Sequence, residues 1–298
     1  MPAGVFTHPA CLLHEPGPGH PEAPARLRAI IDQLNSHPVA KLAEVPAAGS
    51  DALTAVHPPT YLAMLERVSR AGGGMLDADT ILNDRSWDAV VGATGAVLAA
   101  VEHAYAGRGH AFAAVRPPGH HALADTAMGF CLVNNAVIAA RRLQALGRAR
   151  VLIVDWDVHH GNGTQAIVER DASIRYVSIH QFPWYPGTGL ASERGVGNVF
   201  NVPRPPGLPP GKYVADLWEA IELAGTGWAP DALVISAGFD TMAGDPLGGF
   251  TLEPSDYGEL THRLRDRFPA CPIVGTLEGG YNPSRLADGV LAHVTALG

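Results

Sequence analysis

The stretch VLIVDWDVHHGNG, residues 151–163, says more about the fold and the site of this chain than any other segment. It begins with Val151–Trp156, which is apolar at all but one position, and such a run is typical of a strand buried on both faces. Asp157 and His159 follow and, being two residues apart, would point to the same side of an extended backbone. A carboxylate beside an imidazole is a ligand pair for zinc and related metals, which indicates a metal site. Two other interpretations stay open: Asp157 could cap a helix, and His160 could be a hydrogen-bonded core histidine.

Strand-like and helical segments alternate over the last two thirds of the sequence. The expected strands are Ala111–Val115, Val151–Trp156, Ile174–Ile179, Ala232–Ala237 and Ile273–Leu277. The expected helices are Asn135–Leu146, Gly211–Ala224, Ser255–Arg267 and Pro283–Ala296. This alternation predicts an α/β fold in which a mostly parallel central sheet is flanked by helices on both faces.

The other segments are expected to add helices and loops to the same unit. The N-terminal third is predicted to be mostly helical, over Pro24–Ser36, Pro59–Arg70 and Ser86–Tyr105. Two segments rich in glycine and proline, Gln181–Gly197 and Asn201–Gly211, are expected to form long ordered loops over the carboxyl edge of the sheet. Because the sequence has no internal repeat and no low-complexity linker, residues 1–298 are expected to form a single domain.

The composition argues against several classes of protein. Of 298 residues, 47% are hydrophobic and 17% charged, as in globular proteins. A net charge of −8 without a long run of Lys and Arg argues against direct nucleic-acid binding, but it is compatible with a cationic substrate. Three widely spaced cysteines without a CxxC motif favour a reducing compartment, and we expect the cytoplasm. The N-terminus lacks a secretory pattern, and the longest apolar stretch, Ala89–Val101, is too short to span a membrane.

Polar side chains follow each of the five predicted strands. In strand order, these segments are Arg116–His121, Asp155–His159, Ser178–His180, Gly238–Asp240 and Glu278–Tyr281. The carboxyl ends of parallel strands meet at one edge of a sheet, where open α/β folds bind their ligands. Packing alone does not explain five polar clusters at this edge, so we expect a single functional site there.

Several blocks of the sequence resemble the signature motifs of one enzyme family. They are HPEAPARL (20–27), RPPGHHA (116–122), MGFCLVNN (128–135), VDWDVHHGNGTQ (154–165), HQFPWYPGTG (180–189), SAGFDTMAGDPLGG (236–249) and LEGGYN (277–282). In this order they are similar to the zinc-dependent deacetylases, which include histone deacetylases, bacterial acetylpolyamine amidohydrolases and acetoin-utilisation proteins. The resemblance spans nearly the whole chain and implies the arginase–deacetylase fold. The motifs HGNG, DPLGG and LEGGY are more similar to class II-like and bacterial members than to class I members.

The resemblance implies a metal centre and a pair of proton carriers. Asp157, His159 and Asp240 match the zinc ligands, and three protein ligands would leave an open position for water and a substrate oxygen. His120 and His121 match the tandem histidines, of which one takes a proton from the attacking water and the other holds a proton or passes it to the leaving amine. Without the resemblance, a helix cap and two structural histidines would be the alternatives.

Three further residues match the partners of this machinery. Asp155 matches the partner of His120, and Asn162 stands where relatives carry Asp or Asn beside the second histidine. A neutral partner should leave His121 less basic than a carboxylate would. Tyr281 matches the tyrosine that donates a hydrogen bond to the developing oxyanion. Outside this context, a tyrosine after two glycines is often an ordinary half-buried aromatic residue.

The resemblance also implies a substrate tunnel. Its expected lining consists of Gly129, Phe130, Tyr185 and Leu247, with Trp184 beside Tyr185 and Asp79 at the rim. Flat aromatic walls suit the apolar, unbranched side chain of an acyl-lysine. Leu247 stands where some polyamine-selective relatives carry an acid, which argues mildly against that selectivity. Asp79 could instead be an ordinary helix cap.

A potassium site is implied by the resemblance as well. Its ligands would be Asp155, Ser178 and the backbone carbonyls of Asp157, His159 and Ile179. These are oxygen ligands, as a hard monovalent cation requires. The site follows from the resemblance alone, because a sequence does not show the direction of backbone carbonyls.

Taken together, the motifs predict a zinc-dependent amidohydrolase that removes acetyl or related acyl groups from acyl-lysine side chains or similar N-acyl amines. Zn²⁺ is the expected metal, with Fe²⁺ as a candidate in vivo, and K⁺ is the expected structural ion. The expected partner is an acyl-lysine peptide or small N-acyl amine, with no direct nucleic-acid contact and no membrane. Alternatives are an acetylpolyamine amidohydrolase, a hydrolase of another small amide or ester, a two-manganese ureohydrolase, and a non-enzymatic acyl-lysine binder. The ureohydrolase would need more carboxylates after Asp240 than this chain carries.

Overall fold

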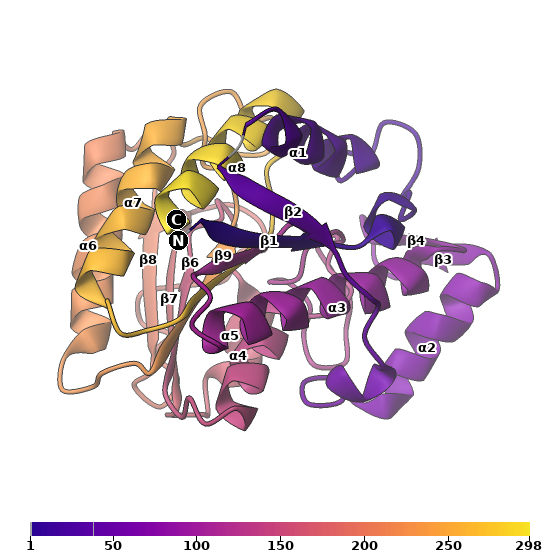
Figure 1. The fold of residues 1–298 in the computed structure, drawn as a ribbon, viewed down its shortest axis with the longest axis horizontal. Helices are drawn as coiled ribbons and strands as arrows, with labels where there is room; N and C mark the ends of the chain where they lie inside the picture. The colour runs from indigo at the N-terminus through magenta and orange to yellow at the C-terminus, as the bar shows by residue number, and fades with distance from the viewer. Residues whose placement is uncertain (1, 38) are drawn as a thin grey trace.

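One eight-stranded sheet forms the centre of the computed structural model, which describes residues 2–37 and 39–298 (Figure 1). In sheet order its strands are β2 (Ala40–Glu44), β1 (Ala3–Thr7), β5 (Ala111–Ala113), β10 (Ile273–Leu277), β9 (Ala232–Ala237), β6 (Val151–Asp155), β7 (Ile174–Gln181) and β8 (Val199–Arg204). Each neighbouring pair is parallel. The predicted fold class, a mostly parallel central sheet flanked by helices, is confirmed.

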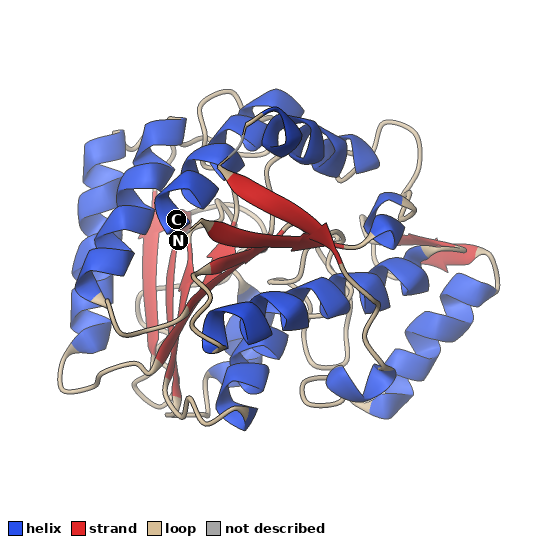
Figure 2. Ribbon diagram, in the orientation of Figure 1, coloured by secondary structure: helices blue, strands red, loops and turns tan. Residues whose placement is uncertain are grey.

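Helices cover both faces of this sheet (Figure 2). One face carries α1 (Pro24–Ser36), α6 (Pro210–Gly225), α7 (Pro254–Arg267) and α8 (Pro283–Leu297). The other carries α3 (Ser86–Tyr105), α4 (Asn135–Ala145) and α5 (Asn162–Val168). To the side of the sheet, α2 (Pro59–Arg70) packs against α3 and against the hairpin of β3 (Gly73–Met75) and β4 (Ile81–Asn83). Two short 3-10 helices, Pro9–Leu12 and Ser50–Ala52, complete the elements.

Local sequence explains where these elements begin and what they bury. Each residue of β6, β9 and β10 is buried, which accounts for their uninterrupted apolar runs. Five helices (α1, α2, α6, α7 and α8) have proline in the first turn, where no backbone N–H is needed. Asn134 and Asn282 cap α4 and α8 by accepting hydrogen bonds from Val137 N and Arg285 N.

The three helices predicted in the N-terminal third are confirmed, with the same bounds, as α1, α2 and α3. The same third also supplies β1 and β2, two strands that are not predicted from the sequence and that form one side of the sheet. The predicted loop Asn201–Gly211 is wrong in its first four residues, which belong to β8. Pro203 is tolerated there because β8 is an edge strand and part of its backbone needs no partner. Helix α5 lies in a segment for which no helix is expected from the sequence.

The sheet order brings the polar segments together. The strands β5, β10, β9, β6 and β7 are consecutive neighbours, and the five polar segments lie at or just beyond their carboxyl ends. Strand β6 ends at Asp155, so Asp157 and His159 lie in the loop beyond it and not on extended backbone as predicted. Across residues 2–37 and 39–298, no helix combines the length and the apolar character that crossing a membrane requires.

Candidate active site

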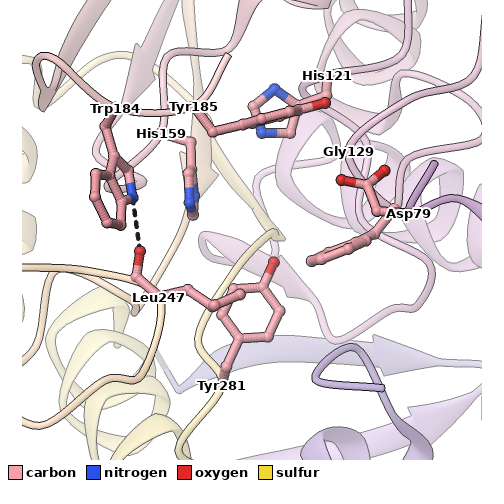
Figure 3. Close-up of a pocket in the computed structure, with 9 residues that line it drawn as sticks. Asp79, His121, Gly129, His159, Trp184, Tyr185, Leu247 and Tyr281 are labelled. Carbon is pink, nitrogen blue, oxygen red and sulfur yellow. Dashed lines mark hydrogen bonds between the residues drawn. The ribbon is translucent and has the colours of Figure 1, made fainter. Parts of the chain in front are cut away.

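A cavity of about 200 Å³ opens at the carboxyl edge of the sheet (Figure 3). Its lining comes from segments far apart in the sequence and consists of Asp79, His121, Gly129, Phe130, His159, Trp184, Tyr185, Leu247 and Tyr281. The hydroxyl of Tyr281 and the rings of His121 and His159 face a common space (Figure 3). The five residues predicted to bind substrate therefore line the same cavity as the predicted proton carrier and oxyanion donor.

Three predicted metal ligands form a buried cluster around His159. One potential ligand atom from each of Asp157, His159 and Asp240 lies within 4.8 Å of the others. The Nδ1 atom of His159 is 2.9 Å from Oδ1 of Asp157 and 3.2 Å from Oδ2 of Asp240. That Asp240 oxygen is buried and has no hydrogen bond within the described part of the chain. Two carboxylate oxygens that converge on one ring nitrogen, one of them unsatisfied, form a set that a divalent cation would complete.

Backbone groups orient the two carboxylates of this cluster. Gly279 N donates to Oδ2 of Asp157 at 2.8 Å, and Val158 N donates to Oδ1 of Asp240 at the same distance. A Cβ atom at Gly279 would lie only 2.1 Å from Oδ2 of Asp240. A residue with a side chain would therefore displace a candidate ligand, which explains the glycine after Glu278.

The electrostatics of the cluster favour a bound positive charge. Burial alone would raise the pKa of Asp157, but His120 and His159 hold that pKa well below its usual value. Burial and the neighbouring charge of Asp157 raise the pKa of Asp240 to about 7. Burial disfavours a charged His159 ring, yet the hydrogen bond with Asp157 and the nearby carboxylate of Asp240 raise its pKa to about 9. A cation bound between these two buried carboxylates would therefore be stabilised.

His120 is paired with a buried carboxylate. Its Nδ1 atom lies 3.1 Å from Oδ2 of Asp155, and Tyr176 Oη donates to the same oxygen at 2.9 Å. Burial disfavours the charged ring, but Asp157 and Asp155 outweigh that effect and raise the pKa of His120 to about 10. This histidine is therefore held in its charged form.

His121 has a neutral partner. Its Nδ1 atom lies 2.8 Å from Oδ1 of Asn162, whose Nδ2 donates to Sδ of Met128 at 3.3 Å. Burial, followed by the charges of His120 and His159, lowers the pKa of His121 well below the usual value. The rings of His120 and His121 lie 4.0 Å apart between centroids. The structure thus sets a charged and a neutral imidazole side by side.

Tyr281 is held at the cavity by its backbone and its ring. Its N–H donates to Oδ2 of Asp245 at 2.6 Å, and the guanidinium of Arg26 lies 4.9 Å from its ring centroid. Arg26 Nε also donates to the carbonyl of Gly280 at 2.6 Å. Burial raises the pKa of the Tyr281 phenol well above its usual value, so the hydroxyl stays a hydrogen-bond donor.

Aromatic residues form two walls of the cavity. Phe130 has a φ of 67°, in the left-handed region, and its N–H donates to Oγ1 of Thr80 at 3.1 Å. Gly129, with a φ of 55°, precedes it in the same left-handed turn. The Tyr185 ring meets the His121 ring edge-on, with 5.1 Å between centroids. Phe130 and Tyr185 thus both contribute aromatic surface to the cavity.

Two loops meet at the rim of the cavity. Trp184 Nε1 donates to the carbonyl of Leu247 at 2.8 Å (Figure 3). Asp79 stands apart from this contact and accepts a hydrogen bond from Oγ1 of Thr80 at 3.0 Å. Its position at the cavity, rather than at the start of a helix, agrees with a rim residue.

The predicted potassium ligands lie at the ends of two neighbouring strands. Asp155 and Ser178 are paired across β6 and β7. Oδ1 of Asp155 accepts from Asp157 N at 3.1 Å, and Ser178 Oγ lies 2.9 Å from Nδ1 of His180. Ile179 follows Ser178 in β7. The potassium site stays a prediction.

His160 proves to be a hydrogen-bonded core histidine. Its two ring nitrogens lie 2.8 Å from Oγ1 of Thr188 and 2.8 Å from Oε1 of Gln165. The side chain is buried and does not line the cavity. Of the two adjacent histidines 159 and 160, only the first faces the site.

A buried ion network beneath the site is not anticipated from the sequence. Arg116 donates to both oxygens of Glu22, through Nε at 2.5 Å and Nη2 at 2.7 Å, and Arg26 Nη1 donates to Oε1 of Glu22 at 3.0 Å. All three side chains are buried. Their positions inside the blocks HPEAPARL and RPPGHHA are the signal that could have identified them, because charged residues are rarely buried unless they are paired.

Similarity to known proteins extends over nearly the whole chain. Residues 20–297 match the profile of the histone deacetylase domain. The protein slr0245 of Synechocystis sp. is 45% identical over 295 residues, which cover 96% of each chain. The crystal structure of the HDA15 HD domain has a TM-score of 0.94 and 36% identity, covering 99% of this chain and 90% of that one. An acetylpolyamine aminohydrolase from Burkholderia pseudomallei has a TM-score of 0.91 and 30% identity, covering 99% and 98%.

Proposed function

The chain belongs to the histone deacetylase family, and on this basis we propose that it is a zinc-dependent amidohydrolase that removes acetyl or related acyl groups from acyl-lysine side chains or similar N-acyl amines. One observation carries this proposal. The cluster of Asp157, His159 and Asp240, the neutral His121 and the hydroxyl of Tyr281 meet at a single cavity with aromatic walls. Hydrolysis of an amide needs a polarised carbonyl, a base for the attacking water and a donor for the oxyanion, and each has a candidate here.

The donor set of the cluster fits zinc. Two carboxylates and one imidazole are ligands that Zn²⁺ accepts, and the buried, unsatisfied oxygen of Asp240 supports a cation at this point. When bound, zinc would polarise the substrate carbonyl and lower the pKa of water. Asp157, His159 and Asp240 would hold it. Fe²⁺ accepts the same ligands, and which of the two ions is bound in the cell depends on their availability.

The proton transfers are assigned to the histidines by their different environments. His121 is neutral and its Nε2 bears the lone pair, so it would take a proton from the attacking water and return it to the leaving amine. The carboxylates of Asp157 and Asp155 raise the pKa of His120, and its charged ring would stabilise negative charge developing beside it. Tyr281 would donate its hydroxyl hydrogen to the oxyanion formed from the amide carbonyl.

We also propose that potassium binds at Asp155, Asp157, His159, Ser178 and Ile179. The pairing of Asp155 with Ser178 at the ends of β6 and β7 supports this. Thermal unfolding in KCl and in choline chloride at equal ionic strength tests it. A melting temperature that is the same in both salts would rule out a stabilising potassium ion.

An acetylpolyamine is the second candidate substrate, because the similarity to the Burkholderia acetylpolyamine aminohydrolase covers 99% of this chain. Leu247 at the rim argues against an acetylpolyamine substrate, because an apolar side chain cannot pair with a charged amine. We therefore expect an acetyl-lysine peptide to match or exceed acetylspermidine in kcat/KM. A net charge of −8 attracts any polycationic substrate, so the two substrates should be compared at two ionic strengths.

The test is a screen of zinc-loaded protein against acetyl-lysine peptides, longer acyl-lysine peptides and acetylspermidine, with Tyr281→Phe as the matched control. We expect release of acetate and a fall in kcat of about 10²–10³-fold in the control, because it lacks only the oxyanion donor. Tight binding of acyl-lysine without turnover would instead identify a non-enzymatic binder. A polyamine preference above about tenfold that survives high salt would reverse the substrate order.

A further inference from the structure

Glu278 is a buried carboxylate that does not line the cavity. It lies beneath residues 116–121, the histidine loop, which carries His120 and His121. It follows β10, and its side chain accepts three hydrogen bonds. Oε2 accepts from Gly119 N at 2.6 Å and from His120 N at 3.1 Å, while Oε1 accepts from Ser236 Oγ at 2.9 Å. One oxygen thus receives two successive backbone N–H groups of the segment that carries the tandem histidines.

Among the residues that the structure describes, no arginine or lysine donates to the carboxylate oxygens of Glu278. Within the described residues, its side-chain partners are two backbone N–H groups and a hydroxyl. Burying a carboxylate is costly unless such donors are fixed in place, so the donors must be held rigidly. Burial raises the pKa of Glu278 to about 7, although the charge of His120 and the N–H of Gly119 act in the opposite direction.

The histidine loop is pressed onto Glu278 from its other side. A Cβ atom at Gly119 would lie 2.5 Å from Asn135 N and 2.9 Å from the carbonyl of Val133. The loop therefore fits between the start of α4 and the Glu278 carboxylate only with glycine at this position. If the Glu278 carboxylate were removed or displaced, Gly119 and His120 could move into the space that it leaves.

The backbone of Glu278 is also fixed, and it leads to Tyr281. Its N–H donates to the carbonyl of Ala237 at 3.0 Å, and Arg26 Nη2 donates to its carbonyl oxygen. Only two glycines separate Glu278 from Tyr281. One residue thus contacts the histidine loop through its side chain and begins the tyrosine loop through its backbone.

We propose that Glu278 is a positioning residue, which holds His120 and His121 in register with Tyr281 by accepting the N–H groups of Gly119 and His120. The inference rests on the proposed amidohydrolase function. It assigns no contact between Glu278 and the substrate. The carboxylate contributes hydrogen-bond acceptors at fixed positions, and its negative charge is not required.

The test compares Glu278→Leu with Glu278→Gln in zinc-loaded protein on an acetyl-lysine peptide. Leucine removes the acceptors, whereas the glutamine amide oxygen can still accept both N–H groups and its NH₂ can donate to Ser236 Oγ. We expect Glu278→Leu to lower kcat by about 100-fold with KM changed less than about threefold, because misplacing catalytic groups by about 1 Å has an effect of this size. Glu278→Gln should keep kcat within about tenfold of the wild type.

Asp216→Leu is the matched control, because Asp216 is a buried carboxylate on α6, which contributes no residue to the cavity. It should lower the melting temperature and leave kcat unchanged. Equal losses of kcat in Glu278→Gln and Glu278→Leu would overturn the proposal in favour of a role for charge, and a loss confined to KM would overturn it as well. If Glu278→Leu does not fold, the Gln variant alone decides. A wild type without activity on any substrate would instead refute the proposed function.

Discussion

The Nδ1 atom of His121 lies 2.8 Å from the amide oxygen of Asn162. An amide oxygen accepts hydrogen bonds and cannot donate them, so Nδ1 carries the hydrogen and Nε2 bears the lone pair. Met128 supports this orientation, because its sulfur accepts from the amide nitrogen of Asn162. The ring that lines the cavity therefore carries the unprotonated nitrogen that the proposed base requires.

Replacing this base should slow turnover while leaving the metal in place. His121→Ala is expected to lower kcat by about 10²–10⁴-fold, as for the loss of a general acid–base. Steady-state kinetics with metal analysis of the same sample checks this. Near-normal turnover would move the role to another residue.

The partner of His121 should set the acid limb of the pH profile. Asn162→Asp puts a carboxylate beside the ring and raises its pKa, so the neutral form is lost at a higher pH as the solution is acidified. The fall of kcat/KM on the acid side is expected to move upward by about one pH unit. Asn162→Ser, which adds no charge, serves as the control. An acid limb at the wild-type pH in Asn162→Asp would mean that another group controls it.

The metal cluster should depend on Asp240. Asp240→Ala is expected to lose both the bound ion and activity, because it removes one of three ligands and leaves Asp157 and His159 alone. Metal content by mass spectrometry after dialysis, with His121→Ala as a variant that keeps the ion, checks this. Full occupancy in Asp240→Ala would refute the ligand assignment.

The buried network should make the fold sensitive to acid. Burial would raise the pKa of Glu22, but the guanidinium of Arg116 outweighs it and lowers that pKa to about 2. The carboxylate therefore stabilises the fold above its unfolded pKa of about 4.5, and this contribution is lost as the pH falls from about 5 to about 2. It is worth on the order of 3 kcal/mol.

Urea unfolding across this pH range compares wild type with Glu22→Gln. The difference in unfolding free energy should be largest near neutrality and shrink on acidification. Glu259→Gln, which removes a surface ion pair with Arg263, should cost little at any pH. A difference independent of pH would mean that the charge of Glu22 contributes nothing.

The interior of the sheet could be predicted from the sequence, and its margins could not. Strands β6, β7, β9 and β10 are buried on both faces and leave apolar runs. The edge strand β2 contains lysine and glutamate, and the edge strand β8 contains asparagine, proline and arginine. Such residues at an edge prevent pairing with a further strand. These residues resemble a loop when they are read without their neighbours.

The candidate site shows the same division. His121, His159 and Tyr281 could be expected at one sheet edge because each follows a predicted strand. Glu278 belongs to the same motif as Tyr281, yet its contacts are with backbone N–H groups, whose direction no sequence pattern displays. The contact of Trp184 with the Leu247 carbonyl is hidden for the same reason.

The place of β10 bears on how the chain can be synthesised. It is the last strand in the sequence, yet it lies between β5 and β9 in the middle of the sheet. Until residues 273–277 have left the ribosome, β5 and β9 have no partner on that side, and unpaired strands of this kind promote aggregation. The sheet, and the site built on its carboxyl edge, therefore cannot close until residues 273–277 are free to pair with β5 and β9.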